Sequence, residues 1–368
     1  MKTNYFIVII QILIIFSAIS CSDNHDDYKS LSRLTDPGKF TFMLDQLPND
    51  VTGICKIAKQ QSIHHNLLPY FDVPADKWNE MKRAWPSGEP ITGIADMLAI
   101  LEKEAPHNLY DKRKVEQRII GACMTESIFL TSLLRHKNIP ARIRAGYFKN
   151  TMGDHEHIIN FWEKVMREKG RKKELLAEDP NEWKKLMNTI TKKSQIDADK
   201  HIEHWITEYW DEKNNQWRLL DANNMFLKAS SNINVGFHLP KKHFEFAHEA
   251  WQKMRKLGKD YNPGQNEEWP QDGRSHIRSQ MLMDFYNLLN HDMAGFKDRS
   301  GDVAKFVKQK DYSDVSQLEL DELDALAKLL AKNPAKDELV SFYFNSKTMR
   351  IASAEKDRYS FVYNKSMK

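Results

Sequence analysis

Apolar residues recur at helical spacing in three segments of the chain, residues 50–57, 94–101 and 123–134. The third segment is an apolar run that predicts a helix beginning at a cysteine. We expect this helix to end near Asn138, because asparagine tolerates the left-handed conformation of a helix cap, and the proline at position 140 cannot continue a helix.

Strand patterns follow this helix. Residues 139–148 alternate arginine with apolar side chains between positions 142 and 145, which predicts a strand. Farther along the chain, two aromatic-rich segments, 204–210 and 217–221, flank the turn-rich residues 211–216. This arrangement predicts a β-hairpin.

Two registers of this hairpin bring the same two polar residues together. If Trp210 pairs with Trp217, then His204 and Asp221 lie diagonally on one face, because strand side chains alternate. If Trp210 pairs with Asn215, then Asp221 lies directly across from His204. A register shifted by one residue would separate the two side chains, so their proximity depends on the pairing.

The remaining segments give the expected domain organisation. Residues 31–300 are predicted to form one α+β domain, interrupted by a polar, helical insertion over 149–200. Helical periodicity returns over 241–300. Residues 301–368 are predicted to form a C-terminal helical extension, with one helix over 313–330 followed by a charged tail.

The chain begins with a segment typical of protein export. Lys2 supplies a positive charge, and the apolar stretch behind it is shorter than the roughly 20 residues of a spanning helix, so residues 1–20 are predicted to be a signal peptide. Ser20 before Cys21 resembles the lipobox of bacterial lipoproteins, and residues 21–30 would be a polar tether. We expect an exported protein, lipid-anchored to a bacterial membrane through Cys21; plain cleavage or an uncleaved anchor is the alternative.

Composition narrows the range of partners. Hydrophobic residues make up 41% of the 368 residues, enough for a core, and charged residues of both signs make up 29%. The net charge of +4 is small for this length, so no nucleic-acid partner is expected. Three cysteines are too few for a disulfide framework, and Cys55, on an apolar helix face, is interpreted as core packing.

A metal site is the alternative reading of the histidine-rich part of the chain. Its ligands would come from His155, His157, His201, His204 and Glu208. The sequence has no His-Glu-x-x-His run and no second cysteine at zinc spacing, so neither a metal nor another cofactor is expected.

Cys123 is the strongest candidate for chemistry, because it begins a helix and precedes a histidine and an aspartate on two successive strands. The positive end of a helix dipole favours a thiolate, the nucleophilic form of cysteine. His204 would pair with that thiolate and later protonate the leaving group, while Asp221 would orient the imidazole. The backbone N–H of Cys123 and the side chain of Gln117 are candidate oxyanion donors.

Taken singly, a cysteine in an apolar helix or a histidine in an aromatic strand is more often a structural residue. The order of all three residues on compatible elements favours a Cys-His-Asp acyl-transfer site. The same residues resemble the core of the transglutaminase-like superfamily, in particular its bacterial lipoprotein members. The resemblance is carried by Cys123 and by residues 129–130, 133–135, 138–142, 146–147, 204–210 and 217–222.

This resemblance implies a papain-like α+β fold, in which a helix bearing the cysteine packs on an antiparallel sheet bearing the histidine and the aspartate. It also implies that Cys123 is the nucleophile, His204 the general base and acid, and Asp221 the orienting partner. No cofactor is implied.

The expected function is cysteine-dependent hydrolysis or acyl transfer at an amide bond through a thioester, on peptide or protein substrates outside the cytoplasm. Water is the default acyl acceptor, because no residue pattern builds an amine site. Two alternatives stay open: a binding protein that keeps the fold without turnover, and removal of asparagine-linked glycans by the same triad.

Overall fold

The computed structural model describes residues 25–71, 73, 93–104, 108–149, 201–222, 224, 236–258, 261, 263, 273–293 and 311–351. The predicted signal peptide, Cys21, His155, His157 and the expected insertion beyond Lys149 lie outside these residues.

The N-terminal end of the described chain is already part of the fold. The 3₁₀ helix η1 (His25–Lys29) overlaps the segment expected as a tether over 21–30. Its Tyr28 is buried and donates a hydrogen bond to the carbonyl of Leu288 at 2.9 Å. The far end of the expected tether is therefore anchored to the folded chain.

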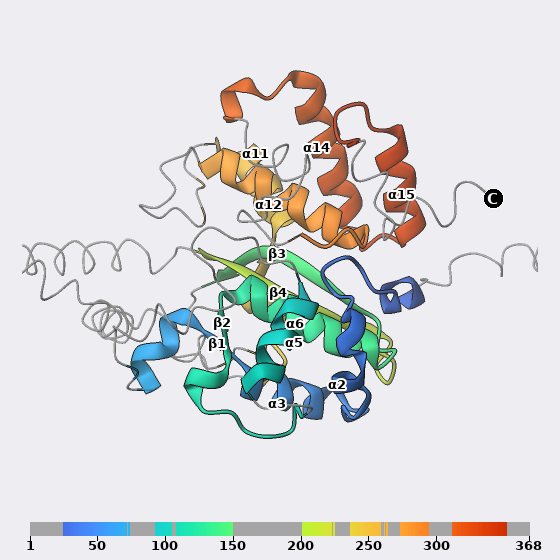
Figure 1. Cartoon of the computed structure of the whole chain (residues 1–368). Coiled ribbons are helices and arrows are strands. Elements are labelled where there is room, and N and C mark those ends of the chain that lie inside the picture. The colour runs from blue at the N-terminus through green and yellow to red at the C-terminus, as the bar shows by residue number, and fades with distance from the viewer. Residues whose placement is uncertain are drawn as a thin grey trace, which may run out of the picture.

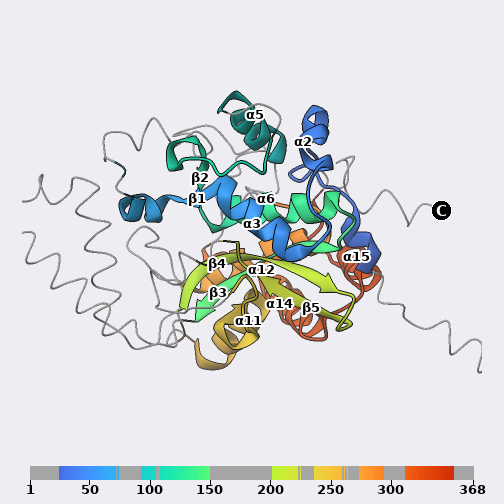
Figure 2. The same ribbon diagram turned by 90° about the horizontal axis from the view of Figure 1, so that it is seen from below.

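A four-stranded antiparallel sheet lies at the centre of the molecule (Figures 1 and 2). Its order is β5-β4-β3-β6, and its strands are β3 (Ala141–Lys149), β4 (His201–Asp211), β5 (Gln216–Leu220) and β6 (Phe244–Phe246). Strand β4 pairs with the whole length of β3. The strand that follows the Cys123 helix is thus held directly beside the strand that bears His204.

Helices cover both faces of this sheet (Figure 1). On one face lie α3 (Val51–Gln61), α5 (Ile94–Glu104) and α6 (Cys123–His136), with α6 packed directly on β3 and β4. On the other face lie α11 (Ala247–Leu257) and α12 (Gly273–Leu288), with α14 (Gln317–Leu330) and α15 (Lys336–Asn345) packed against them. This arrangement confirms the predicted α+β class.

Short elements complete the first layer. Strands β1 (Ser62–His64) and β2 (Ile119–Gly121) pair in parallel. The other short elements are α2 (Thr41–Asp45), η2 (Gly38–Phe40), η3 (His65–Phe71), η5 (Val115–Gln117), η6 (Lys241–His243) and η9 (Tyr312–Asp314). Strand β1 is not predicted from the sequence, because a strand of three residues shows no periodicity and its partner strand lies far along the chain.

Helix α6 lies between the sheet and the outer helices of the first layer. Nearly all of its side chains after Cys123 are buried, polar ones included. The predicted helix end is confirmed: Lys137 is the cap residue, and Asn138 has a φ of 57°, in the left-handed region. Thr131 Oγ1 lies 3.1 Å from Thr207 Oγ1, which ties the helix to β4.

A buried ion network joins α12 to the sheet. The Arg144 guanidinium on β3 donates to both carboxylate oxygens of Asp284 on α12 at 2.9 Å, and to Glu208 Oε2 on β4 at 2.8 Å. Arg142 donates to the same Glu208 oxygen at 2.7 Å. All four side chains are buried, and each faces an opposite charge, which offsets the cost of removing them from water.

The C-terminal helices pack into the same structure. The predicted helix over 313–330 is α14, which begins at Gln317. Its Glu319 accepts a hydrogen bond from Arg278 Nε on α12 at 2.8 Å, and both side chains are buried. The expectation of only a charged tail after residue 330 is wrong, because Lys336–Asn345 forms α15, whose apolar side chains pack into the core.

Candidate active site

The hairpin register decides the geometry of the site. Trp210 pairs with Trp217, and Thr207 pairs with Leu220. This is the first of the two predicted registers; the pairing of Trp210 with Asn215 is wrong. Strand β5 ends at Leu220, so Asp221 follows directly at the edge of the sheet.

His204 and Asp221 form a buried hydrogen-bonded pair. His204 Nε2 lies 2.7 Å from Asp221 Oδ2, and the two residues are 1% and 6% exposed. The rings of Phe148 and Phe244 meet the imidazole edge-on, with centroids 6.2 and 6.5 Å away. The backbone N–H of Asp221 donates to the carbonyl of Phe237 at 2.8 Å, which fixes the carboxylate's backbone. Because Nε2 faces Asp221, Nδ1 is the ring nitrogen left for the thiol.

Cys123 occupies the first position of α6. The residue before it, Ala122, has an extended backbone, so the helix begins at Cys123. Cys123 is half-buried, whereas residues 124–135 of α6 are buried. Its thiol lies close enough to His204 to help raise the pKa of the imidazole. The structure therefore brings together all three residues that the sequence predicted, in the order thiol, imidazole, carboxylate.

The neighbours of His204 determine its charge. Burial on its own lowers the pKa of an imidazole, because it penalises the charged form. The Asp221 carboxylate, and the hydrogen bonds to Asp221 and Cys123, outweigh burial and raise the pKa of His204 from 6.5 to about 10. His204 is therefore an imidazolium at neutral pH, which is the form that pairs with a thiolate.

The competing cysteine and histidine have other roles. Cys55 is 0% exposed in α3, and burial, with the charges of Asp221 and Asp50, raises its pKa to about 12. It is a core thiol, as predicted. His201 Nδ1 lies 2.6 Å from Glu245 Oε2, so this histidine is held by a different carboxylate.

Two further expectations concern oxyanion and metal binding. The Gln117 side chain accepts a hydrogen bond from the backbone N–H of Lys114 at 3.2 Å, which holds its amide against its own turn. Its oxyanion role stays a prediction. Within the described ranges there is no group of three or more His, Cys, Asp or Glu side chains placed to hold a metal ion.

Glu126 is a site neighbour that the sequence analysis did not single out. It lies one turn after Cys123 in α6 and is 6% exposed. Burial, together with the charges of Asp221 and Cys123, raises the pKa of Glu126 well above its ordinary value, which favours the neutral acid. A lone acidic residue within the apolar run 123–134 is the signal that could have identified it.

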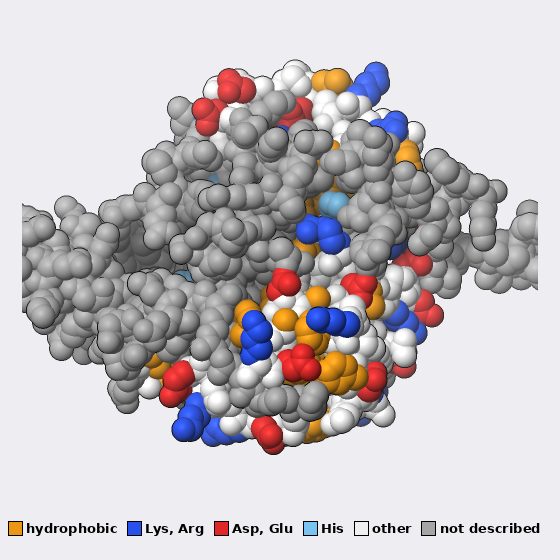
Figure 3. Space-filling view, in the orientation of Figure 1, with side chains coloured by type: hydrophobic (Ala, Val, Ile, Leu, Met, Phe, Trp, Pro, Cys, Tyr) orange, Lys and Arg blue, Asp and Glu red, His pale blue; other side chains and the backbone are white. Residues whose placement is uncertain are grey.

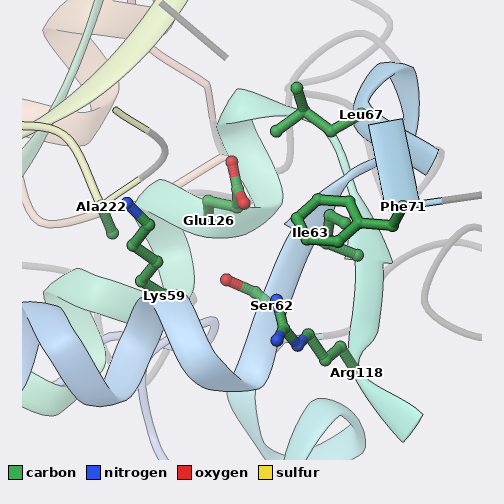
Figure 4. A pocket seen from close by; sticks show the side chains of 8 residues that line it. All are labelled: Lys59, Ser62, Ile63, Leu67, Phe71, Arg118, Glu126 and Ala222. Atoms are coloured by element: carbon green, nitrogen blue, oxygen red, sulfur yellow. The ribbon is translucent and has the colours of Figure 1, made fainter. Parts of the chain in front are cut away.

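A pocket opens beside these residues (Figure 4). It encloses about 260 Å³, including its open mouth. Its lining includes the polar side chains of Lys59, Ser62, Arg118 and Glu126 and the apolar side chains of Ile63 and Phe71. No local sequence pattern predicts that Lys59 and Arg118 line this pocket, because α3 and the segment before β2 meet only in the folded chain.

Comparisons of this chain with protein families, with curated proteins and with solved structures found no match. In the described part of the chain, no helix has the length and apolar character needed to cross a membrane.

Proposed function

We propose that this chain is a transglutaminase-like cysteine enzyme that hydrolyses or transfers acyl groups at amide bonds of peptides or proteins. The observation that carries the proposal is the buried, hydrogen-bonded pair of His204 and Asp221 next to Cys123, which stands at the start of α6. A structural cysteine needs no imidazolium beside it, whereas a nucleophilic thiolate does.

The proposed reaction begins with attack of the Cys123 thiolate on an amide carbonyl. The carbonyl oxygen becomes an oxyanion, for which the backbone N–H of Cys123 is the nearest candidate donor. His204 gives its proton to the leaving amine as the C–N bond breaks, which leaves a thioester on Cys123. His204, now neutral, takes a proton from water, and the hydroxide releases the acid and restores the thiolate. An amine in place of water would give transfer.

The papain-like core is part of the same proposal. A cysteine-bearing helix, α6, packs on the antiparallel strands β3 and β4, and the histidine and aspartate lie on β4 and directly after β5. This is the arrangement that the resemblance to transglutaminase-like proteins implies. The absence of nucleic-acid partners and of a cofactor belongs to the same set of expectations.

The proposed cellular setting is outside the cytoplasm, with the protein attached to a bacterial membrane by lipid on Cys21. It is supported by the sequence around Ser20 and Cys21. We expect mass spectrometry of the mature protein to show an N-terminal, lipid-modified Cys21. A mature N-terminus at any other residue would contradict this part of the proposal.

A binding protein that keeps the fold without turnover is the second candidate. In such a protein, Cys123, His204 and Asp221 would not need to contact one another. The 2.7 Å contact between His204 and Asp221, and the thiol contact of His204, favour the enzyme. Removal of asparagine-linked glycans would use the same triad, and a substrate panel of peptides and glycopeptides separates it from peptide hydrolysis.

Replacement of the nucleophile tests the proposal. We expect Cys123→Ala to lower the turnover of any peptide substrate found by that panel by on the order of 10³-fold or more, because no thioester can form. Circular dichroism and the thermal midpoint should stay close to wild type, since Cys123 is only half-buried. Cys55→Ala is the control and should keep the activity. Undiminished turnover in Cys123→Ala would sink the enzyme proposal.

A further inference from the structure

The pocket of Figure 4 shares its wall with the catalytic candidates. Glu126 lies one turn beyond Cys123 on α6, and Ala222 directly follows Asp221. A substrate whose carbonyl lies at Cys123 therefore has its neighbouring groups next to this pocket. What the pocket binds would contribute to the choice of substrate.

Arg118 gives the pocket a cation that has no matching anion among the described residues. The residue is 9% exposed, and its Nε donates to the backbone carbonyl of Arg113 at 3.1 Å. Within the described ranges, no carboxylate makes an ion pair with its guanidinium. Burial lowers the pKa of Arg118, and the exposed Glu116 partly offsets this effect. Arginine still keeps its charge in proteins, so a nearly buried guanidinium gains from an anionic partner.

The position of this guanidinium allows such a partner to enter. Figure 4 shows Arg118 extending from the segment before β2 toward Ser62, at the side of the pocket. Its guanidinium carbon lies 5.8 Å from the centroid of the Phe71 ring, which supports the side chain from one side. A planar fork held in this way suits a carboxylate, which it can bind with two parallel hydrogen bonds.

Lys59 and Glu126 add to the same preference. Lys59 Nζ donates to Asn224 Oδ1 at 2.5 Å, and its ammonium lies beside Ala222, on the side of the pocket away from Arg118. Glu126 Oε2 has no hydrogen-bond partner among the described residues. In its neutral form, Glu126 adds no negative charge and can donate an O–H to an incoming oxygen. The polar lining is then net positive.

We propose that this pocket is a specificity subsite for a carboxylate of the peptide substrate, with Arg118 as its main contact. The apolar side chains of Ile63 and Phe71 would contact the carbon stem that bears the carboxylate. An acidic side chain and a free C-terminal carboxylate present the same group. This subsite rests on the proposed function, because it treats the bound peptide as the substrate of the enzyme. Binding of the peptide itself does not require the Cys123 thiol.

Binding of three short peptides tests the subsite directly in the Cys123→Ala protein, where no covalent step occurs. The probes are acetyl-Ala-Glu-Ala amide, acetyl-Ala-Gln-Ala amide, and acetyl-Ala-Gln-Ala with a free C-terminus. We expect NMR titration to show that at least one carboxylate peptide binds about tenfold or more tightly than the neutral peptide, as a charge-assisted hydrogen bond implies. The better of the two identifies the source of the carboxylate.

Two further variants decide whether the pocket makes this selection. Arg118→Gln should remove most of the preference, and Lys59→Gln should reduce it. Lys112→Gln removes an exposed charge from the same segment and should leave the preference unchanged. If Arg118→Gln does not fold, as judged by circular dichroism, the Lys59 and Lys112 pair still provides the comparison.

Equal binding of the three peptides would overturn the subsite, as would a preference that Lys112→Gln reduces as much as the pocket variants do. The reactivity of Cys123 is measured separately, in the protein that retains the thiol. Loss of the carboxylate preference with a reactive Cys123 would refute only the subsite. A retained preference with an inert Cys123 would refute the enzyme and leave a carboxylate-binding pocket.

Discussion

At 1% exposure, His204 would be neutral at pH 7 if burial acted alone, because burial penalises the imidazolium. Asp221 and Cys123 reverse this outcome and raise its pKa to about 10. Cys55 provides the contrast within the same core: burial and nearby carboxylates raise its pKa to about 12, so it stays a thiol. Cys123, in contrast, is half-buried and lies beside the His204 imidazolium.

Because the pKa of His204 is raised in the folded protein, the free energy of unfolding should depend on pH. The native state holds this proton more tightly than the unfolded chain does, so the stabilisation is fully present below pH 6.5 and is lost as pH rises through about 10. We expect the free energy of unfolding of wild type, minus that of His204→Gln, to fall between pH 6.5 and 10. Urea unfolding at several pH values measures it. A difference that is constant or rises over this range would contradict the assigned charge state.

The three site residues that the sequence analysis predicted all lie in or next to helices or strands with a clear hydrophobic pattern. Cys123 begins an apolar run, and His204 and Asp221 lie in an aromatic hairpin whose register relates them. Lys59 and Arg118 belong to the pocket only because α3 and the segment before β2 come together in space. No local sequence pattern predicts the contact between α3 and the segment before β2.

The start of α6 depends on how closely β2 approaches it. A Cβ placed on Gly121 would lie 2.4 Å from the Cβ of Thr125, in the first turn of the helix that carries the thiol. The Gly121 carbonyl also lies 3.0 Å from His65 Nδ1. Strand β2 and the first turn of α6 thus fit together only without a side chain at position 121.

We expect Gly121→Ala to reduce the free energy of unfolding by about 1–3 kcal/mol, the usual cost of overpacking, and to slow alkylation of Cys123 by displacing the first turn. Gly236→Ala is the matched control, because a Cβ there meets nothing within 4 Å. It should change stability by less than about 0.5 kcal/mol. Wild-type stability and alkylation in Gly121→Ala would show that the close approach does not position the thiol.

Elements with a clear period were predictable and the others were not. Helix α6, strand β3 and the β4–β5 hairpin appear where the patterns place them, and Asn138 ends α6 in the expected left-handed conformation. Strands β1, β2 and β6 have three residues each, which is too few to show alternation. They form because partners distant in the sequence supply their hydrogen bonds.

At the scale of the whole molecule, the sheet lies between the layer that contains α3, α5 and α6 and the C-terminal helices α14 and α15 (Figures 1 and 2). The site lies where the start of α6, strand β4 and the end of β5 meet. The Arg144, Asp284 and Glu208 network holds α12 on the other face. On the side of the molecule shown in Figure 3, acidic and basic side chains are interspersed over the described surface, consistent with the small net charge of +4.

The proposed function requires Cys123 to react as a thiolate beside the imidazolium of His204, and the pH dependence of Cys123 alkylation is its most direct test. Iodoacetamide labelling, followed by mass spectrometry of the Cys123 peptide, is compared in wild type and His204→Ala, with Cys55 as an internal buried thiol. The account predicts rapid labelling of Cys123 well below the ordinary thiol pKa of about 8.5, lost in His204→Ala. Slow labelling with an ordinary thiol profile in both proteins would contradict it.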